Sequence, residues 1–398
     1  MPDFYQHDLV TTIHDLRTGQ LDRLEGMLRE ATEQNRIGLV LPVTASDMRA
    51  GPFDRIVQQL QDADYIQTII VSLGVAPDRA DLEETLQKVS ALGKRARVLW
   101  TDGPEVQGLY QELIDSGIAV STPGKGRSVW TAFGCLLDDP TIGTFVLHDC
   151  DIVDYDRQLL ARLCLPMVHP ALDFEFCKAF YARVTDRMHG RVVRLLVVPL
   201  LRALLKLFPA SRFVQFLANF RYPLSGEFSL TRNLARTNRI PSDWGLEVGT
   251  LAEVFRNTSI KRVCQADLCR LYEHKHQSAS LDNQQGGLMK MAIDILTTIY
   301  RTLASQGVIL TQDMFITLRS LYLRTAQDCI RQYAADARVN GLNFDRHNEE
   351  TMIDAFASCV TTSAEMFRAD PNGAEAIPNW TRVRAALPDF ADRIRQSA

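Results

Sequence analysis

The chain has 398 residues, of which 46% are hydrophobic and 23% are charged, as in an ordinary globular protein. This length predicts roughly two or three domains with a sizeable buried core, and the composition excludes a disordered chain. The 44 Lys and Arg against 48 Asp and Glu give a net charge of -4. The absence of a basic surplus argues against a nucleic-acid-binding protein.

Cysteine usage and the N-terminus predict a cytoplasmic protein. The eight cysteines are scattered and include no Cys-x-x-Cys pair, which favours reduced thiols over a zinc site. The first ten residues, MPDFYQHDLV, lack the basic and apolar regions of a signal peptide. The longest apolar run, Leu195–Leu201, is too short to cross a bilayer.

Short apolar runs then alternate with helical patterns along the chain. Residues 1–35 are polar, with leucines at helical spacing, and predict a helical segment. Strands are expected at 37–43, 67–73, 97–100 and 144–147, with helices at 53–62, 79–92, 104–116 and 126–138. Each strand is a continuous apolar run, so the pattern predicts an α/β fold, with a mostly parallel sheet covered by helices on both faces.

The C-terminal part has a different pattern. From residue 286 onward the apolar residues recur at helical spacing, which predicts a C-terminal region of three or four helices. We therefore expect three segments: an N-terminal helical segment 1–35, an α/β domain 36–285 and a helical region 286–398. The apolar faces of the last region could form a homodimer interface or cover the sheet domain of the same subunit.

One helix in the middle of the chain is both basic and apolar. Arg191, Arg194, Arg202 and Lys206 project onto one face about 120° wide, and the rest of 192–208 is almost wholly apolar. Such a helix could lie on a membrane surface, or it could be a core helix whose basic stripe faces an anion or solvent. Pro199 interrupts the helix and argues against the membrane.

Two carboxylates follow the fourth predicted strand. Asp149 and Asp151 are separated by one residue, just beyond the end of the strand at which ligands bind in open α/β sheets. Their oxygens suit Mg²⁺ or Mn²⁺, which in turn bind phosphate oxygens. A solvated acidic loop is the alternative, since Asp154 and Asp156 follow closely.

A lysine between two glycines, Gly124-Lys125-Gly126, stands at the start of the helix expected at 126–138. The glycines allow the backbone to approach a ligand, and the lysine places a cation beside a helix N-terminus. The sequence is not a Walker A motif, because the required first glycine and the Ser or Thr after the lysine are both missing. A Gly-x-Gly-x-x-Gly motif after a strand is also missing, so a nicotinamide-binding fold is not supported.

Three further motifs follow: Pro223-Leu-Ser-Gly-Glu227, Trp244-Gly-Leu-Glu-Val-Gly249 and His274-Lys-His276. They come after Pro42-Val-Thr44, the Gly-Lys-Gly motif and the Asp-x-Asp motif. The order of all six motifs along the chain resembles that in the GT-A retaining glycosyltransferases that make hexosylglycerates. That family includes glucosyl-3-phosphoglycerate synthases and mannosylglycerate-type synthases. The resemblance covers about residues 36–280 and implies a GT-A fold.

The resemblance also implies roles for individual residues. The nucleotide sugar donor would be bound by Pro42, Thr44, Gly124, Lys125, Asp149, Leu224, Gly226, Glu227 and Trp244. The anionic group of the acceptor would be bound by Gly190, Arg191, Val193 and His276. The metal ion would be held by Asp151 and His274, and the catalytic residues would be Lys125, Asp149 and Glu247.

Several positions depart from the family pattern. Ser46 replaces an acidic or amide residue, and Ser72–Ala76 replaces an acidic, glycine-rich turn, which leaves the nucleotide base and the donor open. Val193 replaces a threonine and His276 an asparagine, which leaves the acceptor open. Trp244 stands where a tyrosine is usual.

The implied activity is the metal-dependent transfer of a hexose, with retention of configuration, to a small acceptor. UDP-glucose is the expected donor, 3-phosphoglycerate or a glycerate-like molecule the expected acceptor, and a homodimer the expected assembly. A mannosyltransferase, a transferase with another small acceptor, and a non-catalytic sugar-nucleotide-binding module are the alternatives. A nucleotidyltransferase is disfavoured, because 42–47 lacks the glycine-rich loop that this class needs after its first strand.

Overall fold

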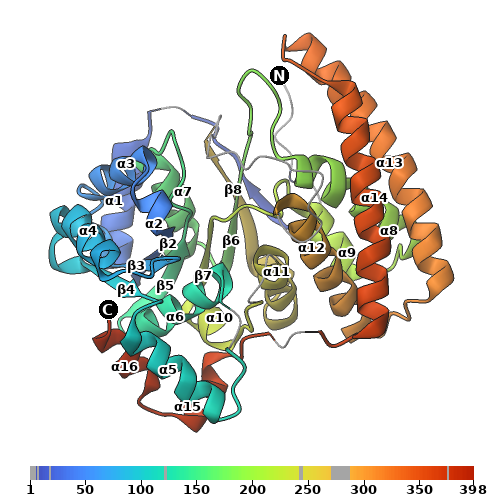
Figure 1. The fold of residues 1–398 in the computed structure, drawn as a ribbon. Helices are drawn as coiled ribbons and strands as arrows, with labels where there is room; N and C mark the ends of the chain where they lie inside the picture. Colours follow the sequence, from blue (N-terminus) through green and yellow to red (C-terminus); the bar gives the residue numbers. More distant parts are fainter. Residues whose placement is uncertain are drawn as a thin grey trace.

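An eight-stranded sheet forms the centre of the molecule (Figure 1). The structure, a computed structural model, describes residues 6, 9–17, 19–120, 123–241, 245–269, 287–373 and 376–398. Along the sheet the strands are ordered β1-β8-β6-β7-β5-β2-β3-β4. They are β1 Thr11–Ile13, β2 Arg36–Thr44, β3 Ile66–Gly74, β4 Ala96–Trp100, β5 Ile142–Leu147, β6 Phe176–Tyr181, β7 Phe228–Thr231 and β8 Val263–Cys269. Only β7 runs antiparallel to its neighbours, so the mostly parallel sheet is confirmed.

The helices account for most of the remaining described chain. In the first half they are α1 Leu21–Thr32, α2 Ala45–Met48, α3 Gly51–Leu60, α4 Arg79–Val89, α5 Pro104–Asp115, α6 Lys125–Asp138 and α7 Arg157–Val168. In the second half they are α8 Val198–Leu207, α9 Arg212–Asn219, α10 Arg232–Thr237, α11 Leu246–Asn257, α12 Gly287–Ser305, α13 Gln312–Val339, α14 Arg346–Ala369, α15 Trp380–Ala386 and α16 Phe390–Gln396.

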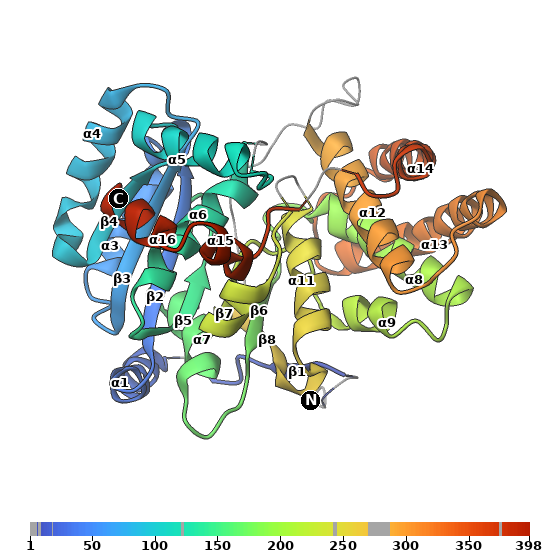
Figure 2. The ribbon, with the colours of Figure 1, turned by 90° about the horizontal axis from the view of Figure 1, so that it is seen from below.

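Both faces of the sheet are covered, as predicted. Along β2, Val40 packs into one core while Leu39 and Leu41 pack into the other, because successive side chains of a strand point to opposite faces. Helices α1 and α7 lie on one side of the sheet, and α6 and α16 lie on the other (Figure 2). Burial on both faces explains why β2 to β5 are continuous apolar runs and could be predicted.

Four strands were not expected from the sequence. β6 and β8 contain polar residues, Lys178 in the first and Gln265 and Asp267 in the second, and β7 has only four residues. β1 lies in the segment predicted to be helical, and that prediction is wrong for Thr11–Ile13, which pairs with β8 at the sheet edge. The leucine-rich part of this segment does form a helix, α1.

The C-terminal region is helical, as predicted, although 287–373 and 376–398 contain five helices instead of three or four. α14 packs against both α12 and α13, and α13 packs against α8 (Figure 1). α15 and α16 return to α6, where the rings of Trp130 and Trp380 stack with their centroids 4.3 Å apart. Gly134 leaves room for Trp380, because a Cβ atom there would lie 2.2 Å from the indole ring.

The basic helix lies inside the protein fold. Residues Val192–Val197 form a π-helical segment that continues into α8, with Pro199 in the first turn of α8. Arg194 is paired with Glu349 of α14, so part of the basic stripe faces a carboxylate of the same chain. None of the helices in the described ranges combines the length and the apolar character needed to cross a membrane.

Candidate active site

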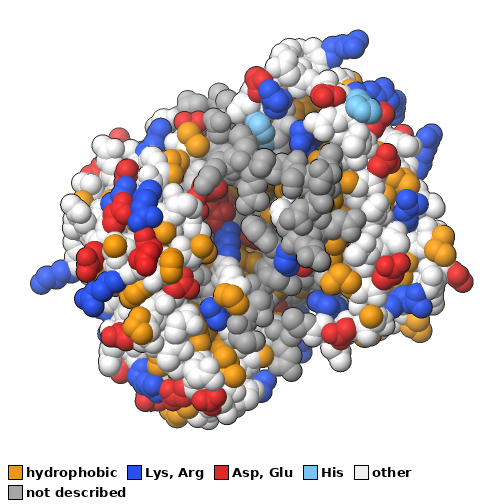
Figure 3. Space-filling model, viewed as in Figure 1, with side chains coloured by type: hydrophobic (Ala, Val, Ile, Leu, Met, Phe, Trp, Pro, Cys, Tyr) orange, Lys and Arg blue, Asp and Glu red, His pale blue; other side chains and the backbone are white. Residues whose placement is uncertain are grey.

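Acidic and basic side chains meet in a hollow between the sheet and the C-terminal helices (Figure 3). Lys125, the first residue of α6, has its Nζ 2.6 Å from Asp149 Oδ1 and 3.4 Å from Glu247 Oε1. Burial acts to lower the pKa of Lys125, but the Asp149 and Glu247 carboxylates outweigh it and raise the pKa above its usual value. The lysine is therefore a permanent cation that joins three separate segments.

The antiparallel pairing of β5 with β7 brings two predicted motifs together. Leu147 at the end of β5 pairs with Phe228 at the start of β7, so the Asp149 loop lies beside the Leu224–Glu227 segment. Gly226 touches the carboxylate directly, because a Cβ atom there would lie 2.1 Å from Asp149 Oδ2. Only glycine fits at this position without displacing Asp149.

Asp151 is a carboxyl group whose charge is poorly compensated. Burial, followed by the repulsion of the Asp149 carboxylate, raises the pKa of Asp151 to about 7. Asp47, which lies in α2 directly after β2, adds to this rise in pKa and accepts a hydrogen bond of 2.7 Å from Thr44 Oγ1. A divalent cation would offset this concentration of negative charge, and oxygen ligands of this kind suit Mg²⁺ or Mn²⁺. The residues present therefore fit the predicted metal.

The described residues supply only part of a metal site. Among them, no group of three or more His, Cys, Asp and Glu side chains could hold a metal ion. The second predicted ligand, His274, lies outside the described residues, as do the predicted donor residue Trp244 and the predicted acceptor residue His276.

A buried polar layer lies beneath the site, and two of its members were not predicted. Tyr181 Oη donates a hydrogen bond of 2.6 Å to Glu227 Oε2, and Lys178 Nζ donates one of 2.5 Å to the Ser225 carbonyl oxygen. Burial lowers the pKa of Lys178 to about 8, although Glu247 and Glu227 act to raise it. The only signal in the sequence is a lysine inside the apolar run Phe176–Tyr181.

The other predicted donor residues surround this centre. Pro42 and Thr44 lie at the carboxyl end of β2, where Thr44 caps α2 through the backbone N–H of Asp47. Gly124 precedes α6, and Leu224 is half-buried against the core.

The three predicted acceptor residues that the structure describes lie on the segment before α8. Gly190 has a φ of 71°, which favours glycine, and a Cβ atom there would lie 3.6 Å from Tyr222 Oη. The Tyr222 ring in turn lies 5.2 Å from that of Tyr181, between centroids. Arg191 is half-buried, whereas the Val193 side chain is 5% exposed and packs in the core. The structure thus brings Gly190 close to the Glu227 layer and turns Val193 away from it.

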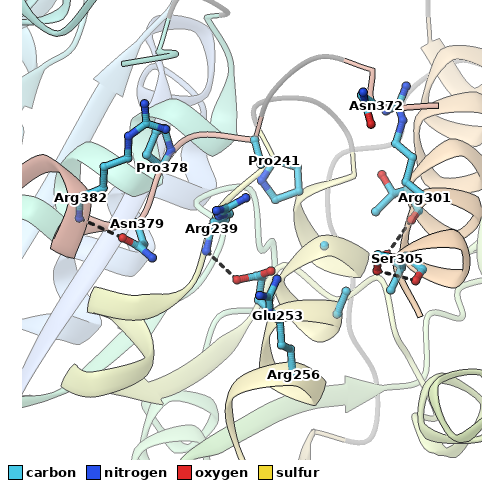
Figure 4. A pocket seen from close by; sticks show the side chains of 15 residues that line it. Arg239, Pro241, Glu253, Arg256, Arg301, Ser305, Asn372, Pro378, Asn379 and Arg382 are labelled. Carbon is cyan, nitrogen blue, oxygen red and sulfur yellow. Dashed lines mark hydrogen bonds between the residues drawn. The ribbon is translucent and has the colours of Figure 1, made fainter. Parts of the chain in front are cut away.

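A separate cavity of about 480 Å³ lies on the other side of α11 (Figure 4). Gly249, Ala252, Glu253 and Arg256 line it from one face of that helix, whereas Glu247 lies on the opposite face, about 170° away around the helix axis. Arginines 239, 301 and 382 contribute from neighbouring segments. This cavity contains none of the predicted site residues.

Comparison with known proteins reveals close relatives. The chain is 44% identical over 398 residues to the glucosyl-3-phosphoglycerate synthase of Persephonella marina, an alignment that covers 99% of this chain and 97% of the relative. It is 36% identical over 405 residues to the enzyme of the same name from Methanococcoides burtonii, with the same coverage. No family model matches the chain.

Solved structures share the fold at lower identity. Glucosyl-3-phosphoglycerate synthase from Mycobacterium tuberculosis, in complex with Mn²⁺, UDP-glucose and phosphoglyceric acid, superposes with a TM-score of 0.53 at 22% identity, covering 76% of this chain and 89% of that chain. Mannosyl-3-phosphoglycerate synthase from Rubrobacter xylanophilus gives a TM-score of 0.54 at 21% identity, covering 76% and 83%. These similarities confirm the predicted GT-A fold.

Proposed function

The chain belongs to the glucosyl-3-phosphoglycerate synthase family of glycosyltransferases, and we propose that it transfers glucose from UDP-glucose to 3-phosphoglycerate with Mg²⁺ or Mn²⁺ as cofactor. The observation that carries the proposal is the contact of Lys125 with both Asp149 and Glu247, next to Asp151. A cation and a metal-binding carboxylate together suit a reaction in which a diphosphate leaves.

The predicted roles fit this geometry. Asp151 and His274 would hold the metal ion, which when bound would offset negative charge on the departing UDP. Lys125 would supply a second positive charge at the same place, held in position by its two carboxylate partners. Glu247 and the Glu227 layer would accept hydrogen bonds from the hydroxyl groups of the sugar and so orient its anomeric carbon.

Retention of configuration is part of the proposal. A double displacement would need a carboxylate free to attack the anomeric carbon, whereas Asp149 and Glu247 are both engaged by Lys125. We therefore favour a front-face substitution in which donor and acceptor are held side by side. A quenched reaction examined by mass spectrometry should show no glucosyl adduct on Glu247, and finding one would overturn this part of the proposal.

The activity test compares two donors and two acceptors. The purified protein is incubated with Mn²⁺, UDP-glucose or GDP-mannose, and 3-phosphoglycerate or glycerate, and products are identified by mass spectrometry. We expect turnover with UDP-glucose and 3-phosphoglycerate and an α-configured product by NMR. Preference for GDP-mannose or for glycerate would instead support the alternative transferases.

A pair of aspartate variants tests the metal assignment. Asp151→Asn should abolish the dependence of the rate on Mn²⁺ and lower kcat/KM by about a thousandfold, through loss of a metal ligand. Asp154→Asn is the matched control, because Asp154 is an exposed carboxylate whose only ion pair to a described residue is a 3.8 Å contact with Arg55. Full activity of Asp151→Asn would refute the assignment.

The predicted homodimer and cytoplasmic location are also proposals. All eight cysteines are free and all but Cys269 are buried, which suits a reducing compartment. Light scattering on the purified protein should give twice the mass of the chain, and fractionation of the source cells should recover the activity with the cytoplasm.

A further inference from the structure

Glu349 connects the C-terminal helices with the segment that carries the predicted acceptor residues. It lies in the first turn of α14, and only 6% of it is exposed. Arg194 donates two hydrogen bonds to its carboxylate, from Nη1 to Oε2 at 2.8 Å and from Nη2 to Oε1 at 3.1 Å. A buried carboxylate with a bidentate arginine partner is well compensated, and breaking such a pair is costly.

Arg194 also donates hydrogen bonds to backbone carbonyl groups in the turn before Arg191. Its Nε donates to the His189 carbonyl oxygen at 2.9 Å, and Nη2 also approaches the Met188 carbonyl oxygen at 3.3 Å. The guanidinium lies over the ring of Tyr333 on α13, 4.8 Å from its centroid. The backbone on which Gly190 sits is therefore fixed by an arginine that α13 and α14 hold in place.

A second contact fixes the same segment at its other end. Between α13 and α14, the Asn343 backbone N–H donates to the Asp186 carbonyl oxygen at 2.8 Å, and its Nδ2 donates to Asp186 Oδ2 at 3.0 Å. Asp186 belongs to the loop that follows β6, and Figure 1 shows that this loop reaches the ends of α13 and α14. One pair of helices thus holds the segment at Asp186 and at Arg194, on both sides of Gly190 and Arg191.

The opposite side of the segment faces the active site. Gly190 lies against Tyr222, whose Oη accepts a hydrogen bond of 3.0 Å from Arg183 Nη1. Arg191 Nε lies 3.7 Å from Glu349 Oε1, which is an ion pair but too long for a hydrogen bond. Glu349 is thus held by Arg194 and orients Arg191 by charge, while the donors of Arg191 can still bind an anion.

We infer that α13 and α14 position the acceptor-binding segment, with Glu349 and Asn343 as positioning residues for Arg191. The inference rests on the proposed function, because it takes Gly190 and Arg191 as the site of the acceptor's anionic group. It gives the C-terminal helices a role in the reaction: they set the affinity for the acceptor without touching it.

The test compares three variants of the full chain. Glu349→Gln removes the charge that Arg194 binds. Asn343→Ala removes the hydrogen bond from Nδ2 to Asp186 Oδ2 without changing any charge, and the backbone hydrogen bond to the Asp186 carbonyl oxygen remains. Glu350→Gln is the matched control, because the Glu350 side chain is 46% exposed and, within the described part of the chain, pairs only with Arg346 on the same helix, at 2.8 Å. We expect the first two variants to raise the KM for 3-phosphoglycerate about tenfold and to leave the KM for UDP-glucose unchanged. The control should behave as the wild type.

Each other result has a defined meaning. A lower KM for the acceptor in Glu349→Gln would show that Glu349 competes with the acceptor, and parallel changes in both KM values would show a general loss of structure. Either result, or wild-type KM values throughout, overturns the inference. Amide hydrogen exchange of residues 186–194 gives a second readout that needs no substrate. It should be faster in the first two variants only, so failure of the proposed function can be told apart from failure of the inference.

Discussion

Lys125 Nζ lies 2.6 Å from Asp149 Oδ1, so an ammonium group at the start of α6 is bound to the loop that follows β5. Glu247 joins the same cation from the first turn of α11. Without the lysine, carboxylates from separate elements would face one another uncompensated in a half-buried site. The lysine therefore holds the acidic side chains together, and the proposed function gives it a second role, the supply of charge for the reaction.

Replacing Lys125 with Met should abolish both roles. We expect kcat/KM to fall by roughly 100- to 1000-fold, the usual effect of losing one preorganised electrostatic contact. The same assay on Lys88→Met provides the control, because Lys88 makes a surface ion pair of 2.6 Å with Asp54 and surface pairs contribute little. If Lys125→Met retained more than a tenth of wild-type activity, Lys125 would not have the role proposed here.

Gly226→Ala tests the contact that positions Asp149. The added methyl group would lie 2.1 Å from Asp149 Oδ2, so the carboxylate that pairs with Lys125 must be displaced. We expect kcat/KM to fall by at least about 100-fold, since small displacements of reacting groups have effects of this size. Thermal unfolding should still show a cooperative transition.

Gly108→Ala is the control for this variant. Gly108 lies within α5, and a Cβ atom there meets no other atom within 4 Å. Alanine should preserve activity and stabilise the helix by about 1 kcal/mol. Equal activity of the two alanine variants would show that Asp149 tolerates displacement.

Tyr181→Phe tests the buried layer beneath the proposed sugar site. It removes the hydroxyl that donates to Glu227 Oε2 at 2.6 Å, and loss of a buried donor to a carboxylate costs about 1.5–3 kcal/mol. We expect the KM for UDP-glucose to rise about tenfold, with little change for the acceptor, as measured by initial rates with each substrate varied in turn.

A second tyrosine supplies the comparison. Tyr65 Oη is buried and has no hydrogen-bond partner among the described residues, so Tyr65→Phe should leave both KM values and the unfolding temperature nearly unchanged. Identical kinetics for Tyr181→Phe and Tyr65→Phe would remove Glu227 from the donor site.

The sequence predicted the strands that are apolar throughout and missed those that carry polar residues. β2 to β5 are buried on both faces, so their composition alone identifies them. In β8, Gln265 breaks the apolar pattern, but its side chain donates to Thr12 Oγ1 and to the Asn219 carbonyl oxygen. Such satisfied polar residues look like loop residues until the partner segments are known.

The same limit applies to the site. The resemblance predicts roles for Lys125, Asp149 and Glu247 one by one, but the contact between them depends on where β5, α6 and α11 meet in the fold. Glu349 could not be predicted, because it lies 155 residues from Arg194 and carries no motif of its own. Buried ion pairs between distant segments depend on tertiary packing, and a single sequence does not record that packing.

The last prediction concerns pH and His148, which is fully buried at the end of β5. Its Nδ1 donates to the Asp149 carbonyl oxygen at 2.9 Å, and its Nε2 accepts from Tyr155 Oη at 3.2 Å. Burial lowers the pKa of His148 to about 4, from 6.5 in an unfolded chain. The unfolded chain therefore binds this proton first as the pH falls, so the contribution to stability is complete above pH 6.5 and is lost towards pH 4.

The total loss from this residue should be about 3 kcal/mol, or about 1.4 kcal/mol for each pH unit. Urea unfolding between pH 7.5 and 4.5 measures it, with His148→Asn compared with the wild type. We expect the variant to be less stable at neutral pH but to lose less stability on acidification, by about that slope. His347→Asn, which replaces an exposed histidine on α14, should follow the wild-type profile. If His148→Asn and the wild type lose stability in parallel, the ring of His148 takes up its proton without unfolding, and its burial does not control the acid stability of the loop that carries Asp149.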